Sequence, residues 1–515
     1  PGDLEIRPDP DWPDWLKSEF EANQDNARVG TQLELLKKAC CGLARAVILS
    51  RWDRSRWGLA MMGRLEAGQE RLFYHFRLED QVPANHLLRK LDALLDLEMV
   101  REQLEPFYSE IGRPSVDPEL MIRMLLIGYC YSIRSERRLC DEVRFNLAYR
   151  WFCGLGLEAA VPHHSTFSVN RHGRFRESAA FRLVFESVVA TCMKVGLVGG
   201  EGFAVDASVV EADASRYQRV EGSEVDWSDE QTAQRPVREY LAALESENAP
   251  VNPGQAPKAM SPSDPAAAWT TRGRHKVQFA YSVNHLVDLL SGVIVDVEAT
   301  PTRISMEVDA VETMLDRVAA RFDLKPERMT ADVAYGTGDL LGAIVARNIA
   351  PHIPVWDKGK RANGTLSRAD FRFEPDRDLY ICPRGNVLTT TGKVHDGRTL
   401  LYRASKHDCD PCPLKLRCCP KEPARKIPRD VNEAARDLAR GLTQTEGYRV
   451  SARQRKMIET GFGDMKRNLG LTRLRLRGLT GANDEFLLAA TVQNLRRLAK
   501  AIWPSPEPTT SPTTA

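Results

Sequence analysis

The sequence predicts a mixed α/β protein, in which a helical N-terminal region precedes a mixed sheet flanked by helices, and a cysteine-rich insertion interrupts the second part. Three observations support this fold class. Apolar residues recur at helical spacing through residues 72–182. Between residues 202 and 356, stretches in which apolar and polar residues alternate, as is typical of strands, are interspersed with amphipathic stretches typical of helices. Helical spacing resumes from about residue 430 to residue 502.

The first strong helix signal lies in SVDPELMIRMLLIGYCYSI, where Asp117 is the expected cap and Pro118 stands in the first turn. Another helix is expected in HHSTFSVNRHGRFR, with Ser165 or Thr166 as its cap. Short helices separated by turns are typical of helix-turn-helix DNA-binding modules. A plain helical bundle with a charged outer face shows the same pattern, so both interpretations stay open.

Between these two helices the sequence predicts a single helix from Ser135 to about Phe152. Several arginines lie along it, and Arg137 and Arg138 are the two that we expect to contact DNA phosphates.

The middle of the chain predicts the sheet. GFAVDASVVEA is a candidate strand, and HKVQFAYSVN and GVIVDVEAT form a candidate hairpin joined through HLVDLLS. The helix EVDAVETMLDRVAARF, the strand RMTADVAYGT, the helix GDLLGAIVARNI and the strand PHIPVW complete a mixed sheet flanked by helices. Residues 216–267 are polar and proline-rich and predict a mobile insertion, whereas residues 371–420 predict cysteine-rich loops.

Two aspartates stand at positions where an acidic side chain is unusual unless it has a function. Asp206 lies within an apolar strand, where a carboxylate is costly unless it is paired or binds a metal. Asp332 ends a second strand, and the ends of neighbouring strands are where sites form in such sheets. Glu211 and Asp213 are alternatives to Asp206, and Asp339 is interpreted as a helix cap.

A third acid lies in RQRKMIETGFGDMKRN, residues 453–468, which predicts one amphipathic helix. Arg455, Glu459 and Lys466 fall on one stripe of this helix, beside an apolar stripe that predicts a core-facing side. An ordinary salt-bridged surface helix would show the same pairs. The apolar stripe consists of Ile458, Phe462, Met465 and Leu469.

If the fold brings Asp206, Asp332 and Glu459 together, their charges require a cation between them. Mg²⁺ (or Mn²⁺) suits oxygen ligands, and two such ions about 4 Å apart clamp a phosphoryl displacement. Arg455 and Lys466 would then hold the phosphate backbone. The surrounding charge agrees, because nine basic and two acidic residues lie from position 449 to position 477, although the whole chain has a net charge of only +2.

The 11 cysteines include a cluster with the spacing C-x26-C-x2-C-x5-C, formed by Cys382, Cys409, Cys412 and Cys418. Four thiolates among proline-rich turns predict a structural Zn²⁺ site, and free thiols in a loop are the alternative. Other cysteines on apolar faces are expected in the core. These are Cys130, Cys140, Cys153 and Cys192.

Trp356 comes after the last predicted strand, beside several basic residues. An aromatic side chain there would stack on an unpaired base of a nucleic acid. Packing in the core is the commoner role of a tryptophan, so both interpretations are kept.

Three ordered motifs resemble DDE transposases of bacterial insertion sequences. Arg455-x3-Glu459-x6-Lys466 is similar to the C-terminal signature of that family, and AVDASVVEA and TADVAYGT look like its two aspartate strands. GLTGANDEFLLAATVQNLRRL resembles the helix that closes those proteins. The resemblance covers about residues 62–502 and implies an RNase H-like catalytic domain with Asp206, Asp332 and Glu459 as the triad. One departure is Ala452, where the family signature often has a tyrosine.

With this resemblance, the domains predicted are an N-terminal extension of unknown role, a helical DNA-binding domain, an RNase H-like core in two parts that flank the cysteine-rich zinc insertion, and a disordered tail. Their ranges are 1–61, 62–195, 196–370 with the mobile insertion at about 216–267, 371–428 for the cysteine-rich insertion, 429–503 and 504–515.

The resemblance implies a transposase that binds terminal inverted repeats, cleaves DNA with two metal ions and transfers the 3′ end to target DNA. Double-stranded DNA is the expected partner, and a homodimer is expected in the DNA complex. A non-catalytic regulator derived from a transposase and a metal-dependent nuclease on the same fold are the alternatives. No apolar run approaches the roughly 20 residues that span a bilayer, and the cysteine usage suits a reducing compartment, so we expect a cytoplasmic bacterial protein on nucleoid DNA.

Overall fold

The computed structural model describes residues 76–108, 115–221, 234–246, 259–272, 276–356 and 365–504, without the side chains of residues 244–246. Every described helix and strand belongs to the unit Phe76–Ala515. The extension predicted for residues 1–61 lies outside the described residues, as do residues 505–515 of the predicted tail. The predicted domain boundaries stay predictions.

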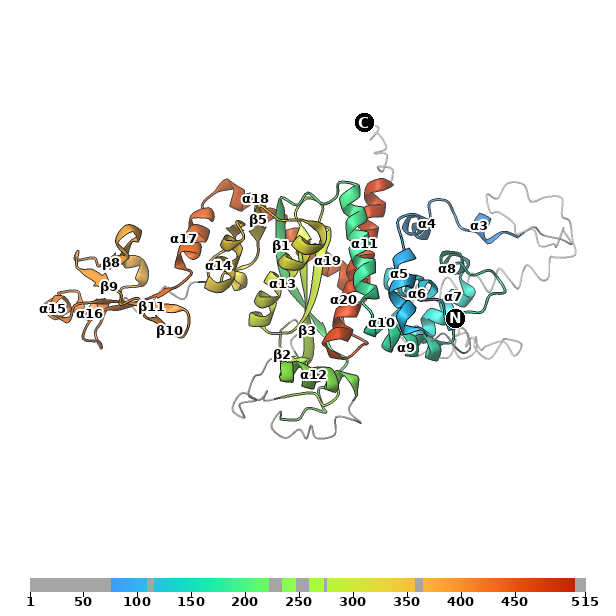
Figure 1. Cartoon of the computed structure of the whole chain (residues 1–515), viewed down its shortest axis with the longest axis horizontal. Helices are drawn as coiled ribbons and strands as arrows, with labels where there is room; N and C mark the ends of the chain where they lie inside the picture. Colours follow the sequence, from blue (N-terminus) through green and yellow to red (C-terminus); the bar gives the residue numbers. More distant parts are fainter. Residues whose placement is uncertain are drawn as a thin grey trace, which may run out of the picture. The chain divides into compact units, whose positions relative to one another are not determined.

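A mixed sheet with β1 at its centre organises the larger hydrophobic core (Figure 1). β1 pairs antiparallel with β3 on one side and parallel with β5 on the other, and β5 continues in parallel to β6. β4 and β2 both pair antiparallel with β3. The predicted fold class of a mixed α/β protein is therefore confirmed. The strands are β1 (Gly202–Glu211), β2 (Ala268–Thr270), β3 (Gln278–Asp288), β4 (Ile294–Pro301), β5 (Arg328–Thr330) and β6 (Ala350–His352).

Helices cover both faces of this sheet, which explains why every residue of β3 is buried. Side chains alternate between the faces of a strand. Ser282 on one face donates a hydrogen bond to Glu307 at 2.7 Å, whereas His285 on the other face stacks on Phe462 with ring centroids 4.7 Å apart. The flanking helices are α13 (Ile304–Phe322), α14 (Gly338–Ala346), α18 (Glu446–Gln454), α19 (Lys456–Arg467) and α20 (Gly478–Ile502).

The predicted hairpin differs from the observed one in its turn. The segment HLVD belongs to β3, because it continues the pairing with β1 and β4, so only residues 289–293 connect the strands. Part of the insertion predicted as mobile is also ordered. Arg235–Ser246 forms helix α12, whereas residues 222–233 and 247–258 of this insertion lie outside the described part.

Residues 76–195 are helical over most of their described length. The cap of α6 is confirmed, because Asp117 accepts a hydrogen bond from the backbone N–H of Glu119 and Pro118 is the first helical residue. The cap predicted for α9 is wrong, because the side chain of His163 takes that role. The helices are α3 (Leu78–Gln81), α4 (Leu87–Asp92), α5 (Glu98–Leu104), α6 (Pro118–Cys130), α7 (Glu136–Phe145), α8 (Leu147–Phe152), α9 (His164–His172), α10 (Arg174–Glu177) and α11 (Ala180–Lys194), with a 3₁₀ turn at Glu105–Phe107.

The single helix predicted from Ser135 to Phe152 is in fact two helices, α7 and α8. Asn146 ends the first and caps the second, since its side-chain oxygen accepts hydrogen bonds from the backbone N–H groups of Ala148 and Tyr149 at 2.9 and 3.2 Å. An asparagine inside an apolar pattern therefore broke the helix by competing for backbone donors. The four cysteines predicted in the core are buried, as expected.

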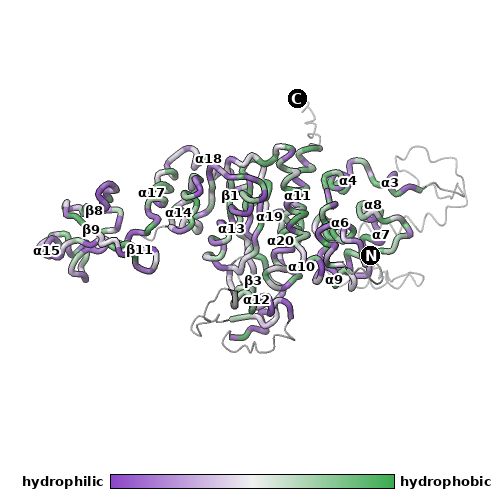
Figure 2. The backbone as a smooth tube through the Cα atoms, in the orientation of Figure 1, coloured by the Kyte–Doolittle hydropathy of each residue, from purple (hydrophilic) through white to green (hydrophobic). Residues whose placement is uncertain are grey.

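The cysteine-rich part forms a second, antiparallel sheet, so the prediction of loops for residues 371–420 is wrong. It has a small hydrophobic core of its own. Figure 2 shows mostly hydrophilic residues around α15, whereas α11 consists largely of hydrophobic residues. Its core residues are Phe371, Tyr380, Leu388, Tyr402 and Ile427. Its elements are β7 (Arg372–Glu374), β8 (Leu379–Ile381), β9 (Val387–Thr389), β10 (Val394–His395), β11 (Thr399–Ala404), α15 (Lys406–Cys409), α16 (Lys415–Cys418) and β12 (Lys426–Asp430), with 3₁₀ turns at Arg368–Asp370 and Pro375–Arg377.

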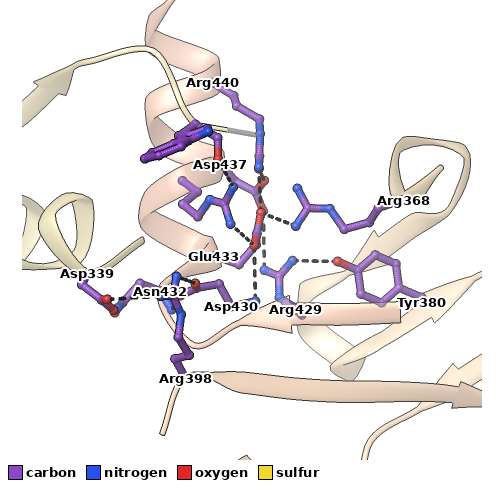
Figure 3. A network of polar contacts seen from close by, with 12 residues as sticks. Asp339, Arg368, Tyr380, Arg398, Arg429, Asp430, Asn432, Glu433, Asp437 and Arg440 are labelled. Carbon is purple, nitrogen blue, oxygen red and sulfur yellow. Dashed lines mark hydrogen bonds and ion pairs between the residues drawn. The ribbon is translucent and has the colours of Figure 1, made fainter. Parts of the chain in front are cut away.

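A buried carboxylate ties the second sheet to the next helix, α17 (Glu433–Leu442) (Figure 3). Glu433 is buried and forms ion pairs with Arg368 at 2.7 Å, Arg440 at 2.8 Å and Arg436 at 3.4 Å. Burial opposes its ionisation, but the three positive charges outweigh that effect and lower the pKa of its carboxyl group. The residues before α17 also lie against α14, because a Cβ atom on Gly338 would be 2.6 Å from Asp430.

A second buried carboxylate, Glu485 on α20, joins three distant segments. It pairs with Arg134, and its Oε1 accepts hydrogen bonds from the backbone N–H groups of Arg475 and Leu476 at 2.5 and 2.6 Å. The hydroxyl of Tyr129 on α6 donates to it at 3.3 Å. Helix α20 therefore holds both the α6–α7 turn and the extended segment that precedes it. Among the described residues, no helix is long and apolar enough to cross a bilayer.

We expect Glu485→Gln to destabilise the protein strongly. Glutamine keeps an acceptor for the two backbone N–H groups but leaves the buried charge of Arg134 unpaired, and breaking such a pair costs about 3–5 kcal/mol. The matched control is Glu446→Gln, because Glu446 is exposed and pairs with Arg449 and Arg453, so its loss costs about 1 kcal/mol or less. Thermal and urea denaturation measure both, and equal stability of the two variants would contradict this role of Glu485.

Candidate active site

The parallel pairing of β1 and β5 places one predicted acid on β1 and the other just after the end of β5. Ala204 pairs with Thr330, so Asp206 and Asp332 both lie two residues further along. Asp206 stays within β1, and its Oδ1 accepts a hydrogen bond from the N–H of Ala207 at 2.8 Å. Asp332 caps the 3₁₀ turn Val333–Tyr335, where its Oδ1 accepts from the N–H of Ala334 at 2.8 Å.

The helix predicted over residues 453–468 is divided at Arg455, which ends α18 and begins α19. Its guanidinium lies between two carboxylates, with Nη1 3.4 Å from Asp206 Oδ2 and Nη2 3.6 Å from Glu459 Oε1. Glu459 itself is 60% exposed. The apolar stripe of α19 is buried as predicted, which orients this polar side of the helix toward β1.

The pKa of Asp206 depends on the charges of the other two acids and of Arg455. Its pKa is raised to about 6, chiefly because the carboxyl group is buried, and the charges of Asp332 and Glu459 raise it further. The N–H of Ala207 and the guanidinium of Arg455 lower it. Asp206 therefore responds to both other acids, and Arg455 is the cation that offsets their repulsion.

Other acids considered as alternatives are paired elsewhere. Asp213 forms ion pairs with Arg477 at 3.1 Å and Arg473 at 3.3 Å, and Glu211 lies 3.7 Å from Arg473. Asp339 is not the cap of α14, because Thr337 accepts the capping hydrogen bond from Leu340.

The remaining predicted contacts lie at different distances from the acids. Lys466 is seven residues beyond Glu459 on α19, a rise of about 10 Å. Arg137 and Arg138 are exposed on α7, and Arg138 pairs with Glu142 at 3.3 Å. Trp356 is 41% exposed, so it is not a fully buried core residue.

Trp356 is nevertheless fixed beside the Asp332 turn. Its backbone N–H donates to the carbonyl of Gly336 at 2.9 Å, and its carbonyl accepts from Arg436 at 3.1 Å. The two segments approach so closely that a Cβ atom on Gly336 would collide with the carbonyl oxygen of Pro354. Tyr335, which the sequence interpretation missed, is buried in the same turn with no hydrogen-bond partner for its hydroxyl among the described residues.

The predicted zinc ligands also lie together. Cys382, Cys409, Cys412 and Cys418 line one cavity of about 30 Å³ in the second sheet, and all four are partly buried free thiols. Among the described residues, no group of three or more His, Cys, Asp or Glu side chains is arranged so that it could hold a metal ion, either here or at the three acids.

The strand order and the flanking helices define a mixed α/β protein. Two family models then match the chain. Residues 76–173 match the Transposase domain (DUF772) family, and residues 381–499 match the Transposase DDE domain family. The resemblance to DDE transposases of insertion sequences is therefore confirmed. The second match includes the helix of Glu459 but neither Asp206 nor Asp332.

One solved structure is described as a piggyBac transposase synaptic complex with hairpin DNA. It is 9% identical in sequence, covers 81% of this chain and 79% of its own, and has a TM-score of 0.30. A likeness of this size carries no argument about this chain.

We expect Gly336→Ala to disrupt the turn that carries Asp332. The added methyl group would lie 2.6 Å from the backbone nitrogen of Trp356 as well as against Pro354 O, and such overpacking costs about 1–3 kcal/mol or more. Gly156→Ala is the control, because a Cβ atom there meets nothing within 4 Å. The melting temperature should fall for the first variant alone, and an unchanged melting temperature for both would contradict the close approach.

Proposed function

We propose that this protein is a DNA transposase that binds the terminal inverted repeats of its element, hydrolyses DNA with two metal ions and joins the freed 3′ end to target DNA. The observation that carries the proposal is the arginine bridge from Asp206 to Glu459, beside Asp332, in a chain that matches two transposase domain families. We further propose that two copies of the chain act together on a pair of DNA ends.

The donor set suits the metal that this reaction requires. Asp206, Asp332 and Glu459 offer only carboxylate oxygens, which hard divalent cations prefer. Mg²⁺ (or Mn²⁺) held by these three residues would activate a water molecule and neutralise charge at the leaving oxygen. Arg455 supplies the compensating positive charge at present. When a metal cation neutralises the carboxylates instead, the guanidinium of Arg455 would be free to hold a DNA phosphate through paired N–H donors.

The proposed chemistry balances without an energy source. In cleavage, a water oxygen forms a bond to phosphorus, and the P–O3′ bond breaks with its electron pair leaving on the 3′ oxygen, which then takes a proton. In joining, that 3′ hydroxyl oxygen bonds to a target phosphorus while the target P–O3′ bond breaks. One phosphodiester bond replaces another, so the residues named here need only position and stabilise charge. Lys466, Arg137, Arg138 and Trp356 are proposed to contact the DNA outside the acid cluster.

The two alternative functions differ from a transposase in what they would do to DNA. A non-catalytic regulator would bind end-containing DNA without cutting it, whereas a nuclease on the same fold would cut without joining. A strand-transfer assay on end-containing DNA in Mg²⁺ separates the three, because only a transposase gives the joined product.

We expect Glu459→Gln to reduce both cleavage and joining by about a hundredfold or more, a loss comparable to removing one charge-stabilising group from other active sites. Binding to end-containing DNA should persist, because its phosphate contacts come from other residues. The two rates and the affinity are measured on one preparation. The control is Glu446→Gln on the preceding helix, which should behave as the unaltered protein. Full cleavage by Glu459→Gln would reject the proposed triad.

We also propose that the second sheet holds a structural Zn²⁺. Cys382, Cys409, Cys412 and Cys418 face one cavity, and four thiolates are a common ligand set for this ion. Their Zn²⁺ would add the stability that the small core of this sheet lacks.

Replacing Cys409 and Cys412 together by serine should therefore remove zinc from the purified protein and lower its melting temperature. Cys140→Ala, in the helical region, should leave the zinc content unchanged because Cys140 is a buried core residue. Elemental analysis measures the metal directly. Absence of zinc from protein purified without any chelator would contradict the proposed site.

A further inference from the structure

The segment LTRLRLRGL, residues 471–479, alternates between the core and the surface. Leu474 and Leu476 are buried, whereas Arg473 and Arg475 are exposed and Arg477 is partly exposed. Strand-like alternation of this kind directs every second side chain outward. We call Arg473, Arg475 and Arg477 the arginine row.

Backbone contacts fix the arginine row at the far end of β1. The N–H of Glu211 donates to Thr472 O at 3.1 Å, and the N–H of Leu474 donates to Glu211 O at 2.7 Å. On the other side, Glu485 accepts from the N–H groups of Arg475 and Leu476. The row is therefore held in place before any ligand binds, which reduces the entropy cost of binding.

The arginine row lines a two-lobed groove. One lobe has a volume of about 1140 Å³ and the other about 430 Å³, and Asp213 and Arg477 line both. With shared residues counted once, the described lining contains eight Lys or Arg and three Asp or Glu side chains. Asp213 is already engaged by Arg473 and Arg477. The groove is thus positive and suited to a polyanion.

The larger lobe also carries an aromatic side chain in an unusual position. Tyr217 is 81% exposed, although large aromatic residues are mostly buried. The guanidinium of Arg216 lies 4.7 Å from the centre of its ring and donates a hydrogen bond to its hydroxyl. An exposed aromatic ring within a cationic groove is typical of sites for unpaired nucleic-acid strands, where bases stack on the ring and phosphates meet the cations.

The groove lies at a defined distance from the acids. Asp206 and Glu211 are five residues apart on β1, which spans about 17 Å at the rise of a strand. That length corresponds to about five nucleotides at the spacing of B-DNA.

We propose that this groove binds a short unpaired stretch of DNA about five nucleotides from the cleaved bond, with its phosphates on the arginine row and one base stacked on Tyr217. The proposal rests on the proposed transposase function for the identity of the DNA, but the binding itself requires neither metal nor cleavage. It assigns the groove to the substrate strand, separately from Arg455 and the acids.

The test uses the full chain without divalent metal and two fluorescent probes, a duplex of about 20 base pairs and the same duplex with an unpaired extension of about five nucleotides. The unaltered protein should prefer the extended probe. Tyr217→Ala should weaken binding of that probe about tenfold and leave the blunt probe unchanged, and Tyr217→Phe should retain the preference. Arg475→Ala should lower the slope of log affinity against log salt by about one for the extended probe.

Arg321→Ala is the control, because Arg321 is an exposed arginine on α13 that pairs with Glu186 outside the groove. A second readout places 2-aminopurine in the extension, whose fluorescence should be quenched by Tyr217 and restored in Tyr217→Ala. Equal binding of both probes by the unaltered protein, or unchanged binding by Tyr217→Ala, would overturn the proposal. Failure of the unaltered protein to cut DNA in Mg²⁺ would instead reject the transposase function and leave this binding result standing.

Discussion

The parallel pairing of β1 with β5 is the constraint on which the site depends. It brings Asp206 and Asp332 side by side, and α19 adds Glu459 from a third direction. Like charges so close, one of them largely buried, oppose the folded state unless a cation intervenes. In this structure the cation is Arg455. The pKa of Asp206 is nonetheless raised to about 6, chiefly by burial of its carboxyl group and further by the charges of Asp332 and Glu459. An acid cluster that costs stability and is nonetheless built into the sheet is the physical basis for proposing a metal site here.

Buried carboxylates elsewhere hold the elements that frame this cluster. Glu485 joins α20 to the α6–α7 turn and to the arginine row, and Glu433 joins the second sheet to α17 (Figure 3). Both are surrounded by arginines that keep them ionised. Such buried ion pairs add little net stability, because the cost of desolvating the charges offsets most of their attraction. Their main effect is to specify which segments of the chain contact one another. Each buried carboxylate thus joins segments that are distant in the sequence.

Much of this arrangement can be predicted from the sequence, because the signals are local. The strand around Asp206, the cap at Asp117 and the buried stripe of α19 rest on periodicity and capping, which neighbouring residues decide. One error arose where a single polar residue outweighed the pattern, as Asn146 does between α7 and α8. The second sheet was missed because its strands are short and lie between turns. The bridge from Arg455 to Asp206 joins residues 249 positions apart, so spacing alone gave no sign of it.

The most direct measurement is the number of Mn²⁺ ions that each chain binds when end-containing DNA is present, monitored by electron paramagnetic resonance. Mn²⁺ prefers oxygen to thiolate ligands, so the cysteine cluster contributes little to the count. We predict about two ions per chain, as expected for a two-metal site, and a loss of this binding in Asp206→Asn. The same number and affinity of ions in both proteins would contradict the claim that these three carboxylates form the metal site.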